Sequence, residues 1–202
     1  MYIIFEGSDG VGKSTQIQLL AAKLREISGK KILCTHEPTD GKWGKLIKEK
    51  TATLPLPDVH SLAVWFSRDR HDHLLSVVCP AIEEENIVLQ DRYYLSTLVY
   101  QGETPELRDM IARHSFLFCI EPTLWIILER RLDKAIKSVG LRGAVDGFEQ
   151  QPELQQRVRD SYVSVAGKYC IAPVIIEHVV EGDAQATHER IWEKFQQLNI
   201  LE

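Results

Sequence analysis

Residues 2–16 read YIIFEGSDGVGKSTQ, and this stretch decides the fold. The apolar run at 2–5 predicts a buried strand, and the helix-forming residues at 16–26 predict a helix soon after it. Between them, residues 7–14 fit the pattern G-x-x-x-x-G-K-[ST]. A strand, this glycine-rich loop and a helix, in that order, distinguish a phosphate-binding loop from a chance turn.

The loop contains the residue types that phosphate binding needs. Its glycines let the backbone aim N–H groups at phosphate oxygens, and the following helix begins with the positive end of its dipole. Lys13 adds a mobile charge for the terminal phosphates, and the Ser14 hydroxyl is placed for Mg²⁺. We predict that a nucleoside triphosphate is bound by Gly7, Ser8, Asp9, Gly10, Val11, Gly12, Lys13, Ser14 and Thr15.

Length and composition predict one soluble domain. The chain has 202 residues, enough for a substantial core, and its hydrophobic content of 44% and charged content of 26% are ordinary for a globular protein. The net charge of −5 gives no indication of a nucleic-acid surface. No apolar run approaches the ~20 residues that cross a bilayer.

Targeting signals and cysteines bear on the compartment. Met1 leads straight into the first strand, without a signal or transit peptide. The four cysteines are dispersed and form no C-x-x-C pair, which is typical of free thiols in a reducing compartment. We therefore expect a cytoplasmic protein with no nucleic-acid and no membrane partner.

Strands and helices alternate along the rest of the chain. Further strands are predicted at 31–35, 87–89, 124–128 and 173–176, and further helices at 43–50, 58–84, 93–101, 106–114, 132–138, 154–166 and 187–198. Pro80 predicts a kink near the end of the long helix. Because several strands are apolar throughout, we predict an α/β fold with a parallel sheet covered on both faces. No linker divides the chain, so residues 1–202 form a single domain, and 139–151 is predicted as a mobile loop.

Ligands of such sheets bind outside the carboxyl ends of the strands. Gly7, Glu37, Asp91 and Arg92 each follow a strand, so we expect them along one rim. Asp91 can hold Mg²⁺, directly or through water, and Arg92 can fork onto a phosphate. The alternative is a salt bridge that closes the strand end.

The long predicted helix carries a second candidate group. Phe66 and Arg70 lie four residues apart and share a face, where they could stack on and hydrogen-bond a base, or simply pack in the core. His71 and His73 flank Asp72, but residues two apart do not share a helix face. We therefore predict a solvated surface there and no metal site.

At these landmarks the sequence resembles the thymidylate kinase family. Residues 5–16 resemble that family's F-E-G-x-D-G-x-G-K-[ST]-T-Q, and residues 66–70 resemble its F-x-x-D-R. Residues 91–102 are similar to D-R-Y-x-x-S-x-x-A-Y-Q-G, and R-G-x-x-D-x-x-E at 142–149 resembles the lid. The four landmarks stand in the right order and cover most of the chain.

The resemblance implies a three-layer P-loop kinase fold, with a five-stranded parallel sheet, helices on both faces and a short lid at about 139–151. It implies a homodimer that uses ATP and Mg²⁺ to phosphorylate dTMP to dTDP in deoxythymidine nucleotide biosynthesis. A phosphate monoester has a second pKa near ~6 and is mostly a dianion at neutral pH, so the acceptor needs no general base.

The resemblance also implies roles for individual residues. By matched position, Asp9 contacts the acceptor sugar and Tyr100 crowds a 2′-hydroxyl. Phe66 stacks on thymine, Arg70 hydrogen-bonds it, and Arg92 binds the acceptor phosphate. The expected substrate-binding set is Asp9, Glu37, Phe66, Arg70, Arg92, Ser96, Thr97, Tyr100 and Gln101, the catalytic set is Lys13, Arg92, Asp9 and Arg142, and the metal set is Ser14 and Asp91.

Some positions depart from the family pattern. His36 stands where an arginine is expected, and Gly10 stands where some members carry a catalytic arginine. The lid would then supply that charge, and Arg142 is the best candidate, although Gly147 replaces the usual lid arginine. Residues 129–131 read E-R-R instead of D-V-P, and the two arginines could substitute or form a surface pair.

Two other functions stay open. Glu37-Pro38 with Trp43 downstream looks a little like the E-P-x-x-x-W of deoxynucleoside kinases, in which the glutamate is the base towards a sugar hydroxyl. Asp9-Gly10 in the loop and the Y-Q-G run count against that function. The other candidate is a nucleotide-binding regulatory module, although the guanine-reading N-K-x-D is missing from the sequence.

Overall fold

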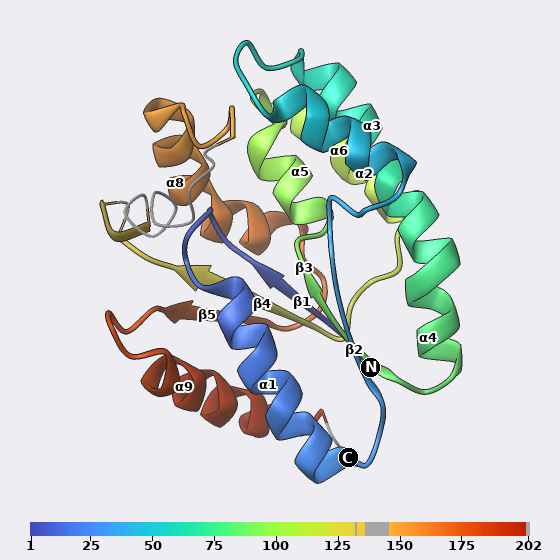
Figure 1. Ribbon diagram of the computed structural model, residues 1–202, viewed down its shortest axis with the longest axis vertical. Coiled ribbons are helices and arrows are strands. Elements are labelled where there is room, and N and C mark those ends of the chain that lie inside the picture. Colours follow the sequence, from blue (N-terminus) through green and yellow to red (C-terminus); the bar gives the residue numbers. More distant parts are fainter. Residues whose placement is uncertain (132, 136–145, 201–202) are drawn as a thin grey trace.

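The computed structural model describes residues 1–131, 133–135 and 146–200. A five-stranded sheet forms the centre of the molecule, with its strands in the order β2-β3-β1-β4-β5 and every neighbouring pair parallel (Figure 1). The strands are β1 (Tyr2–Glu6), β2 (Ile32–His36), β3 (Ile87–Asp91), β4 (Leu124–Glu129) and β5 (Val174–His178). The predicted strands are confirmed to within two residues at each end.

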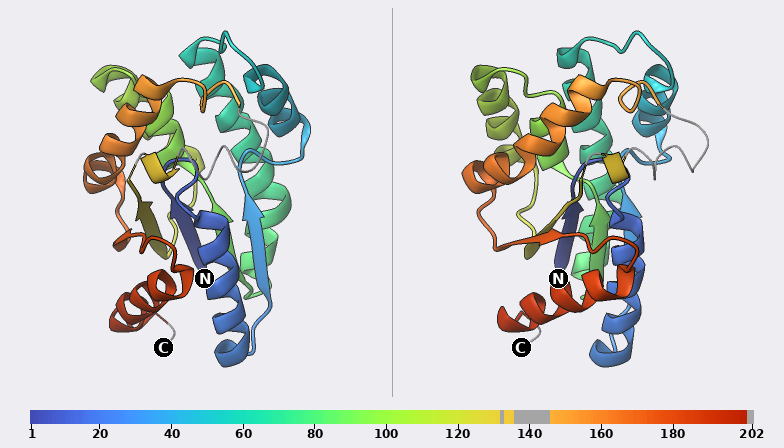
Figure 2. Two further views of the ribbon diagram at one scale, coloured as in Figure 1. Left: turned by 60° about the vertical axis from the view of Figure 1, so that its left-hand side comes forward. Right: turned by 90° about the vertical axis from the view of Figure 1, so that its left-hand side faces the viewer.

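Helices cover both faces of the sheet, so that the fold has three layers (Figures 1 and 2). On one face lie α1 (Lys13–Ser28) and α9 (Ala184–Gln197). The other face carries α3 (Val59–His73), α4 (Cys79–Glu83), α5 (Tyr94–Tyr100), α6 (Pro105–Phe118) and α8 (Pro152–Tyr169), and α2 (Lys42–Thr51) packs against α3. Every helix in the described part of the chain is too short or too polar to span a membrane.

Alternate residues of the strands feed two separate cores. Ile3 of β1 and Ile126 of β4 face α1 and α9, whereas Ile4 and Trp125 face the helices on the other side. All four side chains are fully buried. A parallel sheet buried on both faces needs such continuous apolar strands, and this is why the sequence pattern predicts the α/β class correctly.

The strand register brings the carboxyl ends together at one rim. Phe5 of β1 pairs with Asp91 of β3 and with Ile126 of β4, and His36 of β2 also pairs with Asp91. The loops after these strands therefore start side by side. This confirms the rim expected for Gly7, Glu37, Asp91 and Arg92.

The helical stretch predicted at 58–84 runs from Val59 to Glu83, and it is irregular directly ahead of Pro80, near its end, as predicted. Asp58 caps α3 as expected, but a π-helical turn, η1 (Leu74–Val78), separates α3 from α4. Pro80 lacks the N–H that would bond the preceding turn, and the wider turn ahead of it absorbs that mismatch. Of the helix predicted at 132–138, residues 133–135 are helical and the others lie outside the described residues.

Candidate active site

The loop between β1 and α1 adopts a conformation that only glycines allow. Gly7, Gly10 and Gly12 have φ angles of 137°, 76° and 99°. A Cβ atom on Gly7 would lie 2.4 Å from the carbonyl oxygen of Leu128, so a side chain has no room there. Gly12 is the N-cap of α1 and offers no side chain to the first N–H groups of the helix. A bound anion can therefore accept hydrogen bonds from those N–H groups.

The loop presents backbone rather than side chains at several predicted positions. Ser8 is buried, and Val11 is fully buried in the core on the α1 side. Ser14 and Thr15 are exposed in the first turn of α1. Contacts of Ser8 and Val11 with phosphates would therefore come from their N–H groups, as the nest geometry of such loops requires.

Lys13 lies across the loop and reaches the neighbouring strand. Its Nζ donates to the carbonyl oxygens of Gly7 and Ser8, at 3.1 Å each, and lies 3.9 Å from Oδ1 of Asp91. Burial lowers the pKa of the Lys13 ammonium, and the nearby charge of Arg92 lowers it further. The ammonium is thus held at the junction between β1 and β3, where a terminal phosphate would meet it.

Asp91 and Ser14 together fit a magnesium ion. The Ser14 hydroxyl donates to Oδ2 of Asp91 at 3.3 Å. Oδ1 of Asp91 is buried and accepts no hydrogen bond from any described residue. Hard oxygen ligands are those that Mg²⁺ prefers. Among the described residues no cluster of three or more metal-ligating side chains occurs, so the remaining ligands would be water and phosphate oxygens.

Arg92 follows β3 in an unusual backbone conformation. Its φ angle is 68°, in the left-handed region that non-glycine residues rarely adopt. Nη2 of its guanidinium donates to Oδ1 of Asp9 at 2.5 Å and to the Tyr100 hydroxyl at 3.4 Å. Nη1 donates to Oγ of Ser96 at 2.9 Å and to the Tyr162 hydroxyl at 3.1 Å. Four groups therefore fix the guanidinium before any ligand binds.

The pairing of Asp9 with Arg92 sets the charge of both groups. Burial acts to raise the pKa of the Asp9 carboxyl, but the charges of Arg92 and Lys13 outweigh it and hold that pKa at about 2. Burial acts to lower the pKa of Arg92, and the Asp9 carboxylate raises it. The Tyr100 hydroxyl also donates to Oδ2 of Asp9 at 2.8 Å. Asp9 is therefore ionised at any pH near neutrality.

A cavity of about 290 Å³ opens beside this pair. Its lining includes most residues of the predicted substrate-binding set, namely Asp9, Phe66, Arg92, Ser96, Thr97, Tyr100 and Gln101. The other lining residues include Pro38 after β2, Ile47 and Lys48 of α2, and Phe148. The volume and the few converging polar groups are typical of a small-molecule site. We call it the acceptor cavity.

Glu37 and Arg70, also expected in the substrate-binding set, do not line the acceptor cavity. Nε of Arg70 donates to Oε2 of Glu37 at 2.9 Å, and both side chains are at most 3% exposed. Nη2 of Arg70 donates to Oγ1 of Thr97, which does line the cavity, at 3.0 Å. In this structure Arg70 therefore supports a wall residue rather than facing a base.

The second oxygen of Glu37 is also occupied. Nε2 of Gln90 donates to Oε1 of Glu37 at 2.9 Å, and Nδ1 of His73 lies 3.2 Å from the same atom. The other ring nitrogen of His73 lies 2.7 Å from Oγ1 of Thr35. His73 is buried, so the expectation of a solvated surface was wrong for it, although His71 is exposed. The partners of His73 come from β2 and the segment after it, which helix periodicity does not show.

Sequence reasoning missed Glu6 and Tyr162. Glu6 is fully buried at the end of β1 and accepts hydrogen bonds from the backbone N–H of Tyr93 at 2.8 Å and from the Ser96 hydroxyl at 2.7 Å. Burial raises the pKa of its carboxyl. The hydroxyl of Tyr162, on α8, donates to Glu6 at 3.3 Å. Glu6 lies within residues 5–16, which resemble the family pattern, but Tyr162 has no sequence signal beyond an ordinary helix core position.

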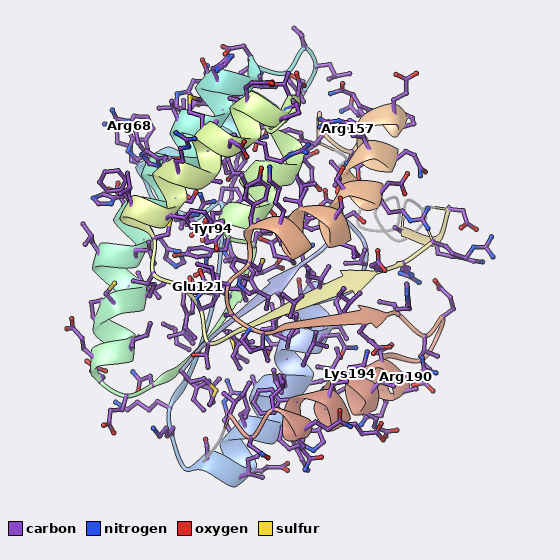
Figure 3. The ribbon with its side chains drawn as sticks, turned by 180° about the vertical axis from the view of Figure 1, so that it is seen from behind. Arg68, Tyr94, Glu121, Arg157, Arg190 and Lys194 are labelled. Carbon is purple, nitrogen blue, oxygen red and sulfur yellow. The ribbon has the colours of Figure 1, made fainter. Side chains whose placement is uncertain are left out.

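Helix α8 is tied to α5 at a second point. Arg157 donates from Nη1 to the carbonyl oxygen of Val99 at 3.3 Å and from Nη2 to that of Tyr100 at 3.2 Å. Figure 3 shows Arg157 on α8, on the side that faces the end of α5. Together with Tyr162, this residue fixes α8 against the helix that carries much of the acceptor cavity wall.

The described part of the predicted lid, residues 146–151, closes one side of the acceptor cavity. The backbone N–H of Gly147 donates to the carbonyl oxygen of Thr51, at the end of α2, at 2.7 Å. A Cβ atom on Gly147 would lie 2.7 Å from Cδ2 of Leu56 and 3.0 Å from the carbonyl oxygen of Thr51, so an arginine there would require these neighbours to shift. Phe148 packs edge-on against the Tyr100 ring, with centroids 5.5 Å apart. The expected lid arginine, Arg142, lies outside the described residues.

Comparisons with known proteins agree with this geometry. A family model described as thymidylate kinase matches residues 5–181. A probable thymidylate kinase from Pyrococcus horikoshii is 34% identical over 171 residues, covering 82% of each chain. A thymidylate kinase from Akkermansia muciniphila is 34% identical over 152 residues, covering 75% of this chain and 73% of its own. The crystal structure of thymidylate kinase from Ehrlichia chaffeensis superposes with a TM-score of 0.73 at 24% identity, covering 97% of this chain and 98% of its own, which shows a common fold.

Proposed function

The chain belongs to the thymidylate kinase family, and from this premise we propose that its rim site transfers the γ-phosphoryl group of ATP to dTMP, giving dTDP for deoxythymidine nucleotide biosynthesis. One observation carries the proposal. Asp9 belongs to the phosphate-binding loop, lines the acceptor cavity and accepts a hydrogen bond from Arg92. The donor and acceptor sites therefore meet at one pair of residues, as direct transfer between two bound nucleotides requires.

On the donor side, the N–H groups of the loop and of the first turn of α1 bind the ATP phosphates, and Lys13 neutralises their terminal charge. Mg²⁺, held by Ser14 and Asp91, would supply further positive charge to the donor phosphates. Arg92 holds the acceptor phosphate in line with the donor. The acceptor is already a dianion at neutral pH, so no side chain has to remove a proton.

On the acceptor side, the lining of the cavity suggests how the nucleoside is held. Phe66 offers a ring to stack on thymine, and Thr97 and Gln101 offer hydrogen-bonding groups to the base. The Tyr100 ring is fixed by its bond to Asp9 and by Phe148, so it forms a rigid wall beside the sugar. Glu37 and Arg70 act behind this wall, through Thr97.

The two alternatives that the sequence left open are not supported. A deoxynucleoside kinase would need Glu37 as a base, but both of its oxygens are taken up by Arg70, Gln90 and His73, and it lies outside the acceptor cavity. A regulatory module would not need an acceptor cavity joined to the phosphate-binding loop. The family match covers most of the chain and favours a phosphotransferase.

A panel of acceptors tests the proposed function. ADP release from Mg-ATP is measured with dTMP, dUMP, dCMP, dGMP, UMP and thymidine at saturating ATP. We expect dTMP to give by far the highest kcat/KM and thymidine to give no turnover. Turnover of thymidine without turnover of dTMP would contradict the proposal, and so would ATP binding without phosphorylation of any monophosphate.

Tyr162→Phe tests the role of α8. The change removes the hydrogen bond that Tyr162 accepts from the Arg92 guanidinium. Because hydrogen bonds to charged groups are stronger than neutral ones, we expect kcat/KM for dTMP to fall about tenfold. The KM for ATP is expected to stay within about twofold of wild type, because Tyr162 does not touch the phosphate-binding loop. Tyr169→Phe is the matched control, since Tyr169 lies on the same helix and donates to Asp109 instead. Wild-type kinetics in Tyr162→Phe would show that the hydrogen bond from Arg92 to Tyr162 of α8 does not contribute to catalysis.

We also propose that the protein is a homodimer and that the interface lies on α3 and α6. Val64 on α3 and Met110 and Phe118 on α6 are 51%, 55% and 56% exposed, and all three line one groove of about 490 Å³. Contiguous apolar side chains of this kind are a frequent feature of protein–protein interfaces. A second copy of the chain, packed through the same two helices, would cover them.

Light scattering during size-exclusion chromatography tests the homodimer. The wild-type mass is expected to be twice that of the chain, and the double variant Val64→Asp/Phe118→Asp is expected to be monomeric, because charges buried in an apolar interface are strongly unfavourable. Ile27→Asp is the control, since Ile27 is 48% exposed but lies on α1, on the opposite face of the sheet. A wild-type monomer, or a double variant that stays dimeric, would exclude this interface.

We propose that residues 1–202 form one kinase domain with its lid at about 139–151, and that the protein acts in the cytoplasm. The domain proposal is supported by the single sheet that joins β1 to β5. The location is supported by the family and by the cysteines. All four are unpaired in the structure, which is usual in a reducing compartment.

A further inference from the structure

Arg130 joins three loops at the rim. It comes directly after β4, and its Nη1 donates to the carbonyl oxygen of Gly10, at the tip of the phosphate-binding loop, at 3.0 Å. Its Nε donates to Oε1 and Oε2 of Glu181, at 3.0 and 3.2 Å, and its Nη2 donates to Oε2 at 2.7 Å. Glu181 lies in the turn between β5 and α9.

The neighbouring arginine behaves differently. The Arg131 side chain is 74% exposed and its Nε donates to Asp133 at 3.1 Å. The Arg130 side chain is only 17% exposed. Arg131 is therefore a surface residue, whereas Arg130 is turned towards the donor site.

The contact with Gly10 acts on a glycine of the loop that has a positive φ angle of 76°. The loop binds phosphates through N–H groups, so its backbone must be held in one shape, and glycines lose the most conformational freedom when that shape forms. A hydrogen bond from a charged guanidinium to a carbonyl oxygen is stronger than a neutral one. The carboxylate of Glu181 holds the other edge of the same guanidinium and so fixes its direction.

We propose that Arg130 and Glu181 form a clamp that holds the tip of the phosphate-binding loop in the shape that binds the donor phosphates. Arg130 is thus a positioning residue for the donor, acting through the Gly10 carbonyl. The inference rests on the proposed function, since it assigns these residues to the ATP side of that site. It separates them from the acceptor cavity, which neither residue lines.

Calorimetric titration with Mg-ADP tests the clamp, comparing wild type with Arg130→Gln and with the control Arg131→Gln. Loss of the bond to the loop is expected to raise the Kd for ADP about five- to tenfold in Arg130→Gln. Glu181→Gln keeps the guanidinium of Arg130 but weakens the contact that fixes its direction, so we expect the Kd for ADP to rise about threefold. Arg131→Gln is expected to leave the Kd for ADP unchanged. Arg130→Lys is expected to recover part of the loss, because an ammonium can reach either the Gly10 carbonyl or Glu181 but not both.

Steady-state kinetics and hydrogen exchange complete the test. The KM for ATP is expected to rise with the Kd for ADP, the KM for dTMP to stay within about twofold, and the amides of residues 8–12 to exchange faster in Arg130→Gln. An unchanged Kd for ADP would overturn the clamp, and so would an equal loss of dTMP affinity. A large fall in kcat with unchanged ADP affinity would also overturn it, since Arg130 would then act on the reacting phosphate directly.

The clamp and the proposed function fail in different ways. ADP binding needs no acceptor, so a wild-type protein that does not phosphorylate dTMP would remove the proposed function while the ADP comparison still decides the clamp. If Arg130→Gln does not fold, as judged by its circular dichroism and melting temperature, Glu181→Gln carries the same comparison.

Discussion

Arg92→Ala is expected to lower kcat/KM for dTMP by about 10³-fold or more. The guanidinium donates to Asp9 of the donor loop and also lines the acceptor cavity, so its positive charge lies between the two nucleotide sites. Its four partners, Asp9, Ser96, Tyr100 and Tyr162, fix it before the substrates bind, so its charge is available without reorganisation. Arginines that stabilise a transferring phosphoryl group contribute about 10³–10⁵ in rate in other enzymes.

Two controls make this result specific. Arg92→Lys keeps the charge but cannot hold Asp9 and Ser96 at once, so we expect it to lose at least about tenfold. Arg159→Ala removes a partly exposed arginine of α8 and is expected to behave as wild type. The Kd for Mg-ADP, measured by calorimetry, shows whether the donor loop of Arg92→Ala is intact. Retention of more than about a tenth of the activity would contradict the role given to Arg92.

Lys13→Met is expected to have the second largest effect, a fall in kcat of about 10²–10³-fold with weaker ATP binding. The Nζ atom bridges the loop carbonyls of Gly7 and Ser8 and approaches Asp91, so the change removes both a structural bridge and the charge nearest the terminal phosphates. Methionine keeps most of the length and the unbranched shape of the side chain while removing its charge and hydrogen bonds.

Lys23→Met is the matched control for Lys13→Met. Lys23 lies on the same helix, with its Nζ 5.8 Å from the centre of the Trp192 ring and away from the loop. The KM for dTMP should stay near the wild-type value in both variants, because neither lysine lines the acceptor cavity. If Lys13→Met kept wild-type kcat, the loop could not be the donor site.

The fold and the rim could be predicted from the sequence because their signals are local. The apolar runs that became β1, β3 and β4 are buried on both faces, as strands of a parallel sheet covered by helices are. The phosphate-binding loop is a continuous stretch whose backbone shape follows from its glycines. Because the strands of a parallel sheet all point the same way, the loops after them all begin at the same edge of the sheet.

The site departs from expectation where contacts cross between elements. Arg70 shares a helix face with Phe66 as predicted, but Glu37, from the segment after β2, draws its guanidinium behind the cavity wall. His73 is buried, and its Nδ1 lies 3.2 Å from Oε1 of the same glutamate. Tyr162 reaches Arg92 across 70 residues of sequence. Periodicity within one helix cannot show a partner supplied by another element.

The most direct test of the central claim is the fate of the γ-phosphoryl group. ATP carrying radioactive phosphorus at the γ position is incubated with the protein, Mg²⁺ and dTMP, and the nucleotides are separated. We expect the label to pass into the β-phosphate of dTDP in proportion to the ADP formed. In Arg92→Ala this transfer is expected to be about 10³-fold slower, and with thymidine in place of dTMP we expect none. Label that is recovered as inorganic phosphate, or that stays in ATP while both nucleotides are bound, would contradict direct transfer at this site.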